Sequence, residues 1–280
     1  MSHHVVHQPM LIRRLSVALI CCLLLASIPL AQTARQQTPT SGKRYPRTVI
    51  RNAVIIDGNG TPASGPKDIV IENNVITEIA ALDPVALKEG RAKRPAQGDA
   101  EIDATGKYVL PGLINLHGHT QDERGGNAQP VDYCLKMWLA CGITTVRDVG
   151  ATKKTLEWRD KSARNEIAAP KIFAYGIFTA PPTPKNADEA RARVRDLKAA
   201  GYDGIKLFGV DRDIMQAMED EARKVGLRVA HHVGVEETNA WDDIKFGTTS
   251  IEHWYGIPDA AIESGRQNFP PSYNQWFGQN

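Results

Sequence analysis

The sequence has no strong excess of either charge. Its 280 residues carry 34 Lys and Arg against 32 Asp and Glu, a formal net charge of +2. A nucleic-acid-binding protein typically has a clear basic excess, so we expect no nucleic-acid partner. Hydrophobic residues make up 42% and charged residues 24%, which is ordinary for a globular protein. The length allows one large domain or two smaller ones with a substantial core.

Cysteine is scarce, which argues against a disulfide framework. Two of the 4 cysteines lie in the apolar N-terminal stretch, and the others are Cys134 and Cys141. If both lie on one helix they are two turns apart, roughly 10 Å along the axis. This is too far for a disulfide. We therefore interpret both as packing thiols rather than as a redox pair or zinc ligands.

The N-terminus has the layout of an export signal. Arg13 and Arg14 precede the apolar stretch LSVALICCLLLASIPLA, and small and polar residues follow. This pattern predicts a secretory signal peptide over residues 1–31. A membrane-anchoring helix is the alternative, since the stretch approaches spanning length. Its proline and the polar residues after it favour cleavage, so we expect a periplasmic or extracellular protein without a stable membrane anchor.

Two regions of different character follow a polar linker at 32–46. Residues 47–108 read as a small all-β unit, with a hairpin in KDIVIENNVITEIA that turns at Asn73 and Asn74. EIDATGKYVL is a further short strand segment of this unit. This composition predicts part of a small N-terminal β-sandwich.

After residue 108, apolar β-branched strands alternate with helices. The strand segments are VLPGLINLHGH, GITTVRDVG, KIFAYG, GIKLFG, RVAHHVG and TSIEHWYG. A helix begins near Asn186, with Glu189 three residues later, and a second follows Asp211. Alternation of this kind indicates parallel β/α units. The predicted fold is α/β: an incomplete (β/α)₈ TIM-type barrel of about six units over 109–262, with an irregular tail at 263–280.

Histidine is also scarce outside the signal segment, and its placement is informative. His117 and His119 end the first barrel strand, where residues i and i+2 face the same side. Two polar residues that simply close a strand at a surface loop would give the same sequence pattern. However, all five histidines after the signal segment lie at strand ends, the others being His231, His232 and His253. A barrel builds its active site there, so the grouping favours a divalent metal site.

Lys206 lies inside the apolar strand GIKLFG. Burying a lysine costs several kcal/mol unless a neighbouring group compensates. Carbamylation by CO₂ would turn the amine into a carboxylate able to bridge two metals. The alternative is an ordinary lysine paired with a carboxylate such as Asp203. The position alone leaves both open.

Five of these stretches, in this order and spacing, resemble the amidohydrolase superfamily of metal-dependent hydrolases. They are YVLPGLINLHGHT, GITTVRDVG, GIKLFG, VAHHVG and SIEHWYG. The likeness is nearest to the imidazolonepropionase-like and prolidase-like branch. The N-terminal β unit resembles the same family's small β-sandwich. The resemblance covers roughly residues 47–256.

The resemblance implies a role for each strand-end residue. His117 and His119 would bind the more buried metal, and carbamylated Lys206 would bridge to a second. His253 and a histidine of the fifth strand would hold that second metal. Only one of the neighbours His231 and His232 can face the barrel, because side chains alternate along a strand. We prefer His232, because VAHHVG aligns best with the family's strand when the histidine directly precedes Val233. Zinc is the default metal, one or two ions, although manganese, cobalt or iron could occupy such a site.

Other charged strand-end residues are interpreted as structural. Glu252 is expected to support a ligand rather than to be one. Arg147 and Asp148 are interpreted as a structural pair near the rim.

One expected element of the family pattern has no match. The resemblance implies a proton-shuttling aspartate after an eighth strand, and the sequence shows no seventh or eighth strand. We assign that role to no residue, and expect either a truncated sequence or a chain that is inactive alone.

The resulting hypothesis is an exported, metal-dependent amidohydrolase of a small amide, cyclic amide or peptide-like substrate. Metal-activated water would attack a carbon–nitrogen bond. The alternatives are a metallo-dipeptidase acting on Xaa-Pro-like peptides and a metal-binding remnant without turnover. A lactonase or phosphotriesterase would use the same metal site. A homo-oligomer is left open.

Overall fold

The computed structural model describes residues 42, 44–124, 126–232, 238–254 and 256–261. The predicted signal peptide, most of the linker and the predicted C-terminal tail lie outside these residues. No helix within the described ranges is both long and apolar enough to span a membrane.

The first sheet is built around strand β1 (Arg47–Ile55). It pairs antiparallel with β2 (Ser64–Glu72), which pairs antiparallel with β3 (Val75–Ala81). The short strands β4 (Ala100–Asp103) and β5 (Tyr108–Val109) both run parallel to β1. The predicted hairpin is present, and its turn residues Asn73 and Asn74 adopt positive φ angles of 50° and 67°. Asparagine tolerates this left-handed conformation better than most residues.

Two details of this region differ from the sequence prediction. The unit is not all β, because α2 (Pro84–Lys88) follows β3, with Asp83 capping its N-terminus. The segment 101–110, predicted as one short strand, instead contributes to two strands, β4 and β5, each of which pairs with β1. Val109 therefore belongs to the first sheet, and the first barrel strand begins later.

The second sheet has six parallel strands, as predicted for a partial barrel. Their order is β13–β12–β11–β10–β9–β6, so neighbours in sequence are neighbours in space. The strands are β6 (Leu113–Gly118), β9 (Ile143–Ala151), β10 (Lys171–Ile177), β11 (Gly204–Leu207), β12 (Arg228–His232) and β13 (Ser250–Glu252). The strands are linked by helices α3 (Val131–Ala140), α4 (Lys153–Ala163), α5 (Ala187–Ala199), α6 (Arg212–Val225) and α7 (Ala240–Phe246), and α8 (Ile257–Ala261) follows β13. A small ribbon, β7 (Glu123–Arg124) with β8 (Asn127–Ala128), follows β6.

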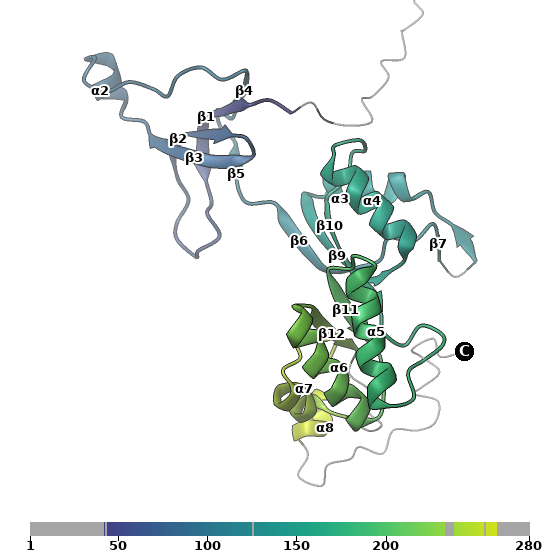
Figure 1. Ribbon diagram of the computed structural model, residues 1–280. Helices are drawn as coiled ribbons and strands as arrows, with labels where there is room; N and C mark the ends of the chain where they lie inside the picture. The colour runs from purple at the N-terminus through teal and green to yellow at the C-terminus, as the bar shows by residue number, and fades with distance from the viewer. Residues whose placement is uncertain (1–41, 43, 125, 233–237, 255, 262–280) are drawn as a thin grey trace, which may run out of the picture. The chain divides into compact units, whose positions relative to one another are not determined.

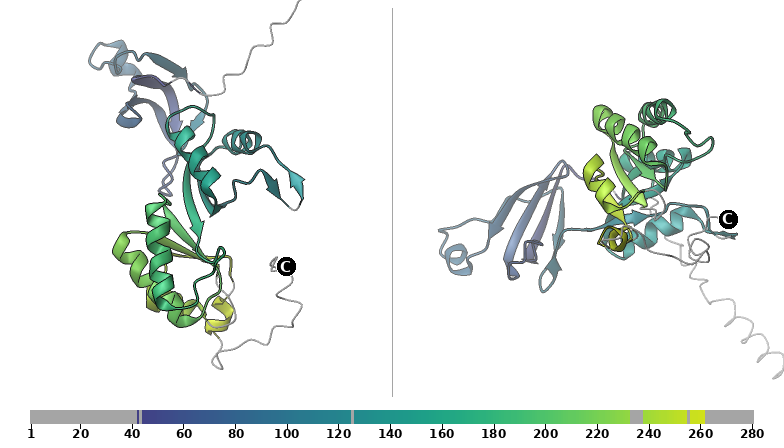
Figure 2. Two further views of the ribbon diagram at one scale, coloured as in Figure 1. Left: turned by 45° about the vertical axis from the view of Figure 1, so that its right-hand side comes forward. Right: turned by 90° about the horizontal axis from the view of Figure 1, so that it is seen from below.

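Helices α5 and α6 begin and end at residues that favour helix termini. Asn186 caps α5 by accepting from the backbone N–H groups of Asp188 and Glu189. Helix α6 ends at Gly226, whose φ of 71° suits a glycine C-cap. Helices α5 and α6 lie along one side of the strands they connect (Figures 1 and 2). Their apolar faces bury the largest core cluster, which includes Val194, Met218 and Phe246.

The two cysteines behave differently from each other. Cys134 on α3 is half-buried, whereas Cys141, the residue after the helix, is exposed, and both are free thiols. The interpretation of Cys141 as a packing thiol is therefore wrong. The reason is that the helix ends before it and the chain turns at Gly142, which has a φ of 79°.

Candidate metal centre

The carboxyl ends of β6, β12 and β13 bring four histidine rings together. The centroid of the His117 ring lies 5.2 Å from that of His119 and 4.6 Å from that of His253. The His253 ring in turn lies 4.7 Å from the His232 ring. These residues come from positions 117 to 253, so only the barrel topology explains their meeting. The four predicted histidine ligands therefore share one site.

Two glycines make room for the first pair of histidines. A Cβ on Gly118 would lie 2.3 Å from Val146 Cγ2, so only glycine lets β6 approach β9 here. The register between these strands also breaks between Asn115 and Gly118. A Cβ on Gly150 would lie 2.9 Å from His119 Nδ1. Sequence reasoning did not identify Gly150, whose only signal was its place at the end of the predicted strand GITTVRDVG.

The neighbours His231 and His232 face opposite sides of β12. The His232 ring lies in the cluster and 5.1 Å from the Phe208 ring. His231 is fully buried, and its Nδ1 lies 2.8 Å from Asp243 Oδ1 on α7. Strand alternation separates the two, as expected. The side chain that shares the site is the one at 232.

Lys206 is buried at the site and lacks an ordinary partner. It is only 1% exposed, and its Nζ has no hydrogen-bond partner among the described residues. Its Nζ lies 5.4 Å from the centre of the Phe208 ring. The alternative pairing with Asp203 is wrong, because that carboxylate accepts from Arg159 at 3.1 Å and from the Ala174 backbone at 2.7 Å.

The environment of Lys206 weakens its hold on a proton. Burial lowers the pKa of Lys206 to about 8; Glu252 opposes this shift and Arg147 adds to it. A larger neutral fraction is what reaction with CO₂ requires, since only the unprotonated amine has a free electron pair. The position thus suits the carbamylation that the family resemblance implies.

Two of the histidines, His232 and His253, are held in their neutral form. Burial, with the nearby charge of Lys206, lowers the pKa of His232 to about 3. Burial and the neighbouring His117 also lower the pKa of His253. Neutral imidazole is the form that binds metal ions. The backbone of His253 has a φ of 61°, an uncommon conformation for a residue with a side chain.

Glu252 forms the centre of a buried network beside these rings. It is 5% exposed, and its Oε2 lies 2.5 Å from His117 Nδ1. Its Oε1 accepts from Ser250 Oγ at 2.8 Å and from the Arg147 guanidinium. Burial alone would raise the pKa of Glu252, but hydrogen bonds from His117 and Ser250 and the charge of Arg147 outweigh it and lower the pKa. Glu252 is therefore an anion in contact with a predicted ligand.

The predicted pairing of Arg147 with Asp148 is wrong. Successive residues of β9 face opposite sides, so their side chains cannot meet. Arg147 reaches Glu252, whereas Asp148 is fully buried and accepts from Thr120, Gly150 and Thr155. Two aspartates near the fifth and sixth strands, Asp242 and Asp243, were not assigned the proton-shuttling role from the sequence. Asp242 accepts from Arg212, and Asp243 pairs with His231.

The four histidine rings and the Lys206 amine are donors that fit a divalent metal. Four imidazoles and a buried amine are nitrogen ligands of the kind that zinc prefers. Within the described part of the chain, however, no three His, Cys, Asp or Glu side chains are arranged to hold an ion as they stand. No candidate for the proton-shuttling aspartate is found among the described residues of the site.

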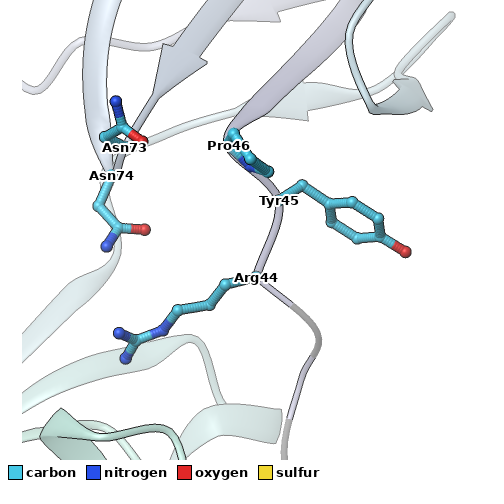
Figure 3. Close-up of a pocket in the computed structure, with 5 residues that line it drawn as sticks. All are labelled: Arg44, Tyr45, Pro46, Asn73 and Asn74. Carbon is cyan, nitrogen blue, oxygen red and sulfur yellow. The ribbon is translucent and has the colours of Figure 1, made fainter.

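The first sheet carries a separate surface hollow beside the β2–β3 turn. Figure 3 shows Asn73 and Asn74 on one side of it and the segment of Arg44, Tyr45 and Pro46 on the other, with the Tyr45 ring pointing away from the asparagines. Its lining contains one charged side chain and no buried titratable group. It offers none of the chemistry present at the strand ends of the barrel.

Comparison with known proteins agrees with this geometry. The model of the amidohydrolase family matches residues 108–261, which include the whole six-stranded sheet and every predicted ligand. The chain therefore belongs to the amidohydrolase family. Members of this family generally depend on divalent metals.

Individual relatives show how much of a longer protein is matched. A dihydroorotase of Trichlorobacter lovleyi is 31% identical over 204 residues, covering 69% of this chain and 44% of the relative. A dihydroorotase of Bacillus licheniformis is 29% identical over 137 residues, covering 47% of this chain and 29% of the relative. The chain thus spans less than half the length of these two relatives.

A solved structure supports the fold. The crystal structure of a Xaa-Pro dipeptidase with bound methionine in its active site has a TM-score of 0.60 and 23% sequence identity. The match covers 74% of this chain and 61% of the dipeptidase. At this identity the likeness shows a common fold.

Proposed function

We propose that this protein is a metal-dependent hydrolase of carbon–nitrogen bonds in small amides, cyclic amides or peptide-like substrates. The main observation in support is that four histidine rings and buried Lys206 lie together at the strand ends of the barrel. Membership of the amidohydrolase family and the dihydroorotase relatives support the choice of bond. We also propose export, for which the basic and apolar N-terminal pattern is the support.

The proposed ligands are His117, His119, Lys206, His232 and His253. When bound, a divalent ion would lower the pKa of a water molecule and polarise the scissile carbonyl group. We take zinc as the metal, one or two ions, and Lys206 as carbamylated when two are bound. The five side chains come from the ends of four strands, so the order of these strands in the sheet determines the spacing of the ligands.

The chain's own residues do three things around that site. Neutral rings at 232 and 253 present electron pairs rather than protons to the ion, because their pKa values are lowered. Phe208 covers the side of the site next to His232 and Lys206 and helps exclude water. Asp148 ties the chain after β6 to β9 and α4, which keeps the mouth of the barrel in place.

The test is a metal-dependent hydrolysis assay of the full chain. Metal-stripped protein is reloaded with Zn²⁺, Mn²⁺ or Co²⁺ and offered dihydroorotate, a hydantoin and an Ala-Pro dipeptide. The double variant His117→Ala/His119→Ala should lose bound metal and activity together. Glu166→Gln, in an exposed pair with Arg164, is the matched control and should retain both.

The substrate panel also separates the alternatives. Preference for the cyclic amides supports an amidohydrolase in the narrow sense, and preference for Ala-Pro supports a metallo-dipeptidase. Metal binding without turnover of any compound would instead favour the metal-binding remnant. Unchanged metal content in the double variant would reject the ligand assignment.

A further inference from the structure

The proposed ligand His117 is held by a side chain from the opposite edge of the sheet. Strands β6 and β13 are the two ends of the six-strand order, yet His117 Nδ1 lies 2.5 Å from Glu252 Oε2. The carboxyl group is 5% exposed, so little water competes for it. A short contact of this kind is typical of a charge-assisted hydrogen bond.

This contact determines which ring nitrogen carries the proton. An ionised carboxylate only accepts hydrogen bonds. Nδ1 of His117 must therefore be the donor. In the neutral form that binds metal ions, the ring's single N–H proton is then on Nδ1. The electron pair available to a metal is then on Nε2, the nitrogen on the far side of the ring from Glu252.

Arg147 keeps the carboxyl group in place through its second oxygen. Its guanidinium donates to Glu252 Oε1, to Ser250 Oγ at 2.8 Å and to the Leu116 carbonyl at 2.6 Å. The same group lies 5.3 Å from the centre of the Tyr175 ring. These partners come from β6, β10 and β13, so Arg147 on β9 fixes the distance between the two edges.

The network therefore sets the spacing of ligands from different strands. Glu252 precedes His253 in the chain, and the ring of His253 lies 4.6 Å from that of His117. Any shift of β13 relative to β6 would break the Glu252 contact and separate these two rings. A carboxylate behind a ligating histidine is a common way to orient the ring and raise its basicity.

We propose that Glu252 is a positioning residue that fixes His117 with Nε2 turned towards the metal, and that Arg147 holds Glu252 in that role. The proposal rests on the proposed metal-binding function of His117. It assigns no ligand role to Glu252, because both of its oxygens already accept hydrogen bonds.

The test compares Glu252→Gln, Glu252→Asp and Arg147→Lys with the control Glu166→Gln in the full chain. A glutamine has one acceptor oxygen, so it can accept from His117 or from Arg147 but not from both. The charged guanidinium of Arg147 is the stronger donor, so we expect the oxygen to face Arg147 and the NH₂ group to face His117 Nδ1. The first measurement is the tautomer of His117 in metal-free protein, from ¹⁵N chemical shifts of labelled histidine. The second is the affinity for Zn²⁺ alone, from competition with a chelator. Circular dichroism confirms that each variant is folded.

We expect the Nδ1–H tautomer to dominate in the wild-type chain and in Glu166→Gln, and to be lost in Glu252→Gln. Zn²⁺ affinity should fall about 10- to 100-fold in Glu252→Gln, the range for loss of a group that orients a metal ligand. Glu252→Asp keeps the carboxylate and should recover part of the loss. Arg147→Lys should weaken binding with a smaller effect on the tautomer.

The outcomes separate this inference from the proposed function. A folded Glu252→Gln variant with wild-type tautomer and affinity overturns the inference, even if the chain hydrolyses amides. The expected changes support it even if no substrate is turned over, because neither measurement involves a substrate. A wild-type chain that does not bind Zn²⁺ overturns it together with the ligand assignment.

Discussion

At the scale of single residues, the proposed metal site depends on a glycine at position 150. Gly150 lies at the end of β9, and a Cβ there would come within 2.9 Å of His119 Nδ1. Real Cβ contacts essentially never occur at that distance. An alanine would therefore push the His119 ring out of the cluster while leaving the backbone of the strand allowed.

We predict that Gly150→Ala lowers Zn²⁺ affinity about 10-fold or more, the effect expected from displacing one ligand. Chelator competition measures it. Gly209→Ala is the matched control, because a Cβ there would meet nothing within 4 Å. Equal affinities for the two variants would show that His119 does not need this space.

Glu219 gives the second prediction at this scale. It is 3% exposed on α6 and accepts from Thr248 Oγ1 at 2.7 Å. Burial, with the nearby charge of Asp243, raises the pKa of Glu219 from 4.5 to about 7. The folded state thus binds the proton more tightly than the unfolded state. The stability that Glu219 contributes is full below pH 4.5 and is lost as the pH rises through about 7.

We predict that Glu219→Gln removes this loss. A shift of this size corresponds to about 3 kcal/mol, so the variant should gain up to that amount relative to wild type at pH 8 and little at pH 4. Urea unfolding at both pH values measures it. Glu221→Gln, which removes a carboxylate paired with Arg195, should show no such gain. A parallel pH dependence in wild type and Glu219→Gln would contradict the assignment.

Sequence reasoning predicted which residues gather at the site, but not the partners that hold them. Alternation along a strand separates His232 from His231, and strand ends place the histidines at one rim. The contact of Arg147 with Glu252 joins residues 105 positions apart. Such a pair depends on how side chains meet across the barrel interior, and no local pattern encodes it. The partners of Asp203, Arg159 and the Ala174 backbone, are likewise distant in sequence, so the alternative Lys206–Asp203 pairing could not be rejected from the sequence. The Arg147–Asp148 pair, in contrast, conflicts with alternation along β9, a local pattern that sequence reasoning did not apply there.

At the scale of elements, one buried carboxylate joins three segments at the barrel mouth. Asp148 on β9 accepts from the Gly150 backbone at 2.8 Å, from the Thr120 backbone at 3.2 Å and from Thr155 on α4 at 3.2 Å. It is fully buried. Removing it would leave several buried donors without an acceptor, each costing about 1–3 kcal/mol.

We predict that Asp148→Ala lowers the free energy of unfolding by at least about 3 kcal/mol, because more than one buried donor loses its acceptor. Chemical denaturation measures it. Asp160→Ala on α4, which removes an exposed pair with Arg159, should cost less than about 1 kcal/mol. Similar losses in the two variants would mean that water satisfies the donors around Asp148.

The elements themselves were largely predictable, for a physical reason. Period-two and helical patterns, N-caps such as Asn186 and terminal glycines such as Gly226 are local signals. The βαβ connections then follow from chain order. The prediction of a single strand over 101–110 was wrong, because β4 and β5 are separate strands. Each pairs in parallel with β1, which lies more than 40 residues earlier in the chain. A two-residue strand such as β5 carries too little pattern to indicate a distant partner.

At the scale of the whole molecule, β6 is an end of the barrel sheet in the described chain. Ile114 and Leu116, two positions apart on β6, are 60% and 61% exposed. Large apolar side chains on an edge strand promote pairing with other chains. The described chain therefore presents a surface suited to self-association, whatever its metal content.

We predict that the chain self-associates through β6 and that Ile114→Thr/Leu116→Thr weakens the association by about 10-fold. Burial of two large apolar side chains is worth at least the ~1.4 kcal/mol that a tenfold change represents. Threonine keeps the β-branched shape that strands prefer, so folding should be preserved. Sedimentation velocity over a concentration series measures the effect. The control is Val75→Thr/Ile76→Thr on β3, where both side chains are 60% exposed in the first sheet. If both double variants lower association equally, general surface hydrophobicity and not the β6 edge drives it.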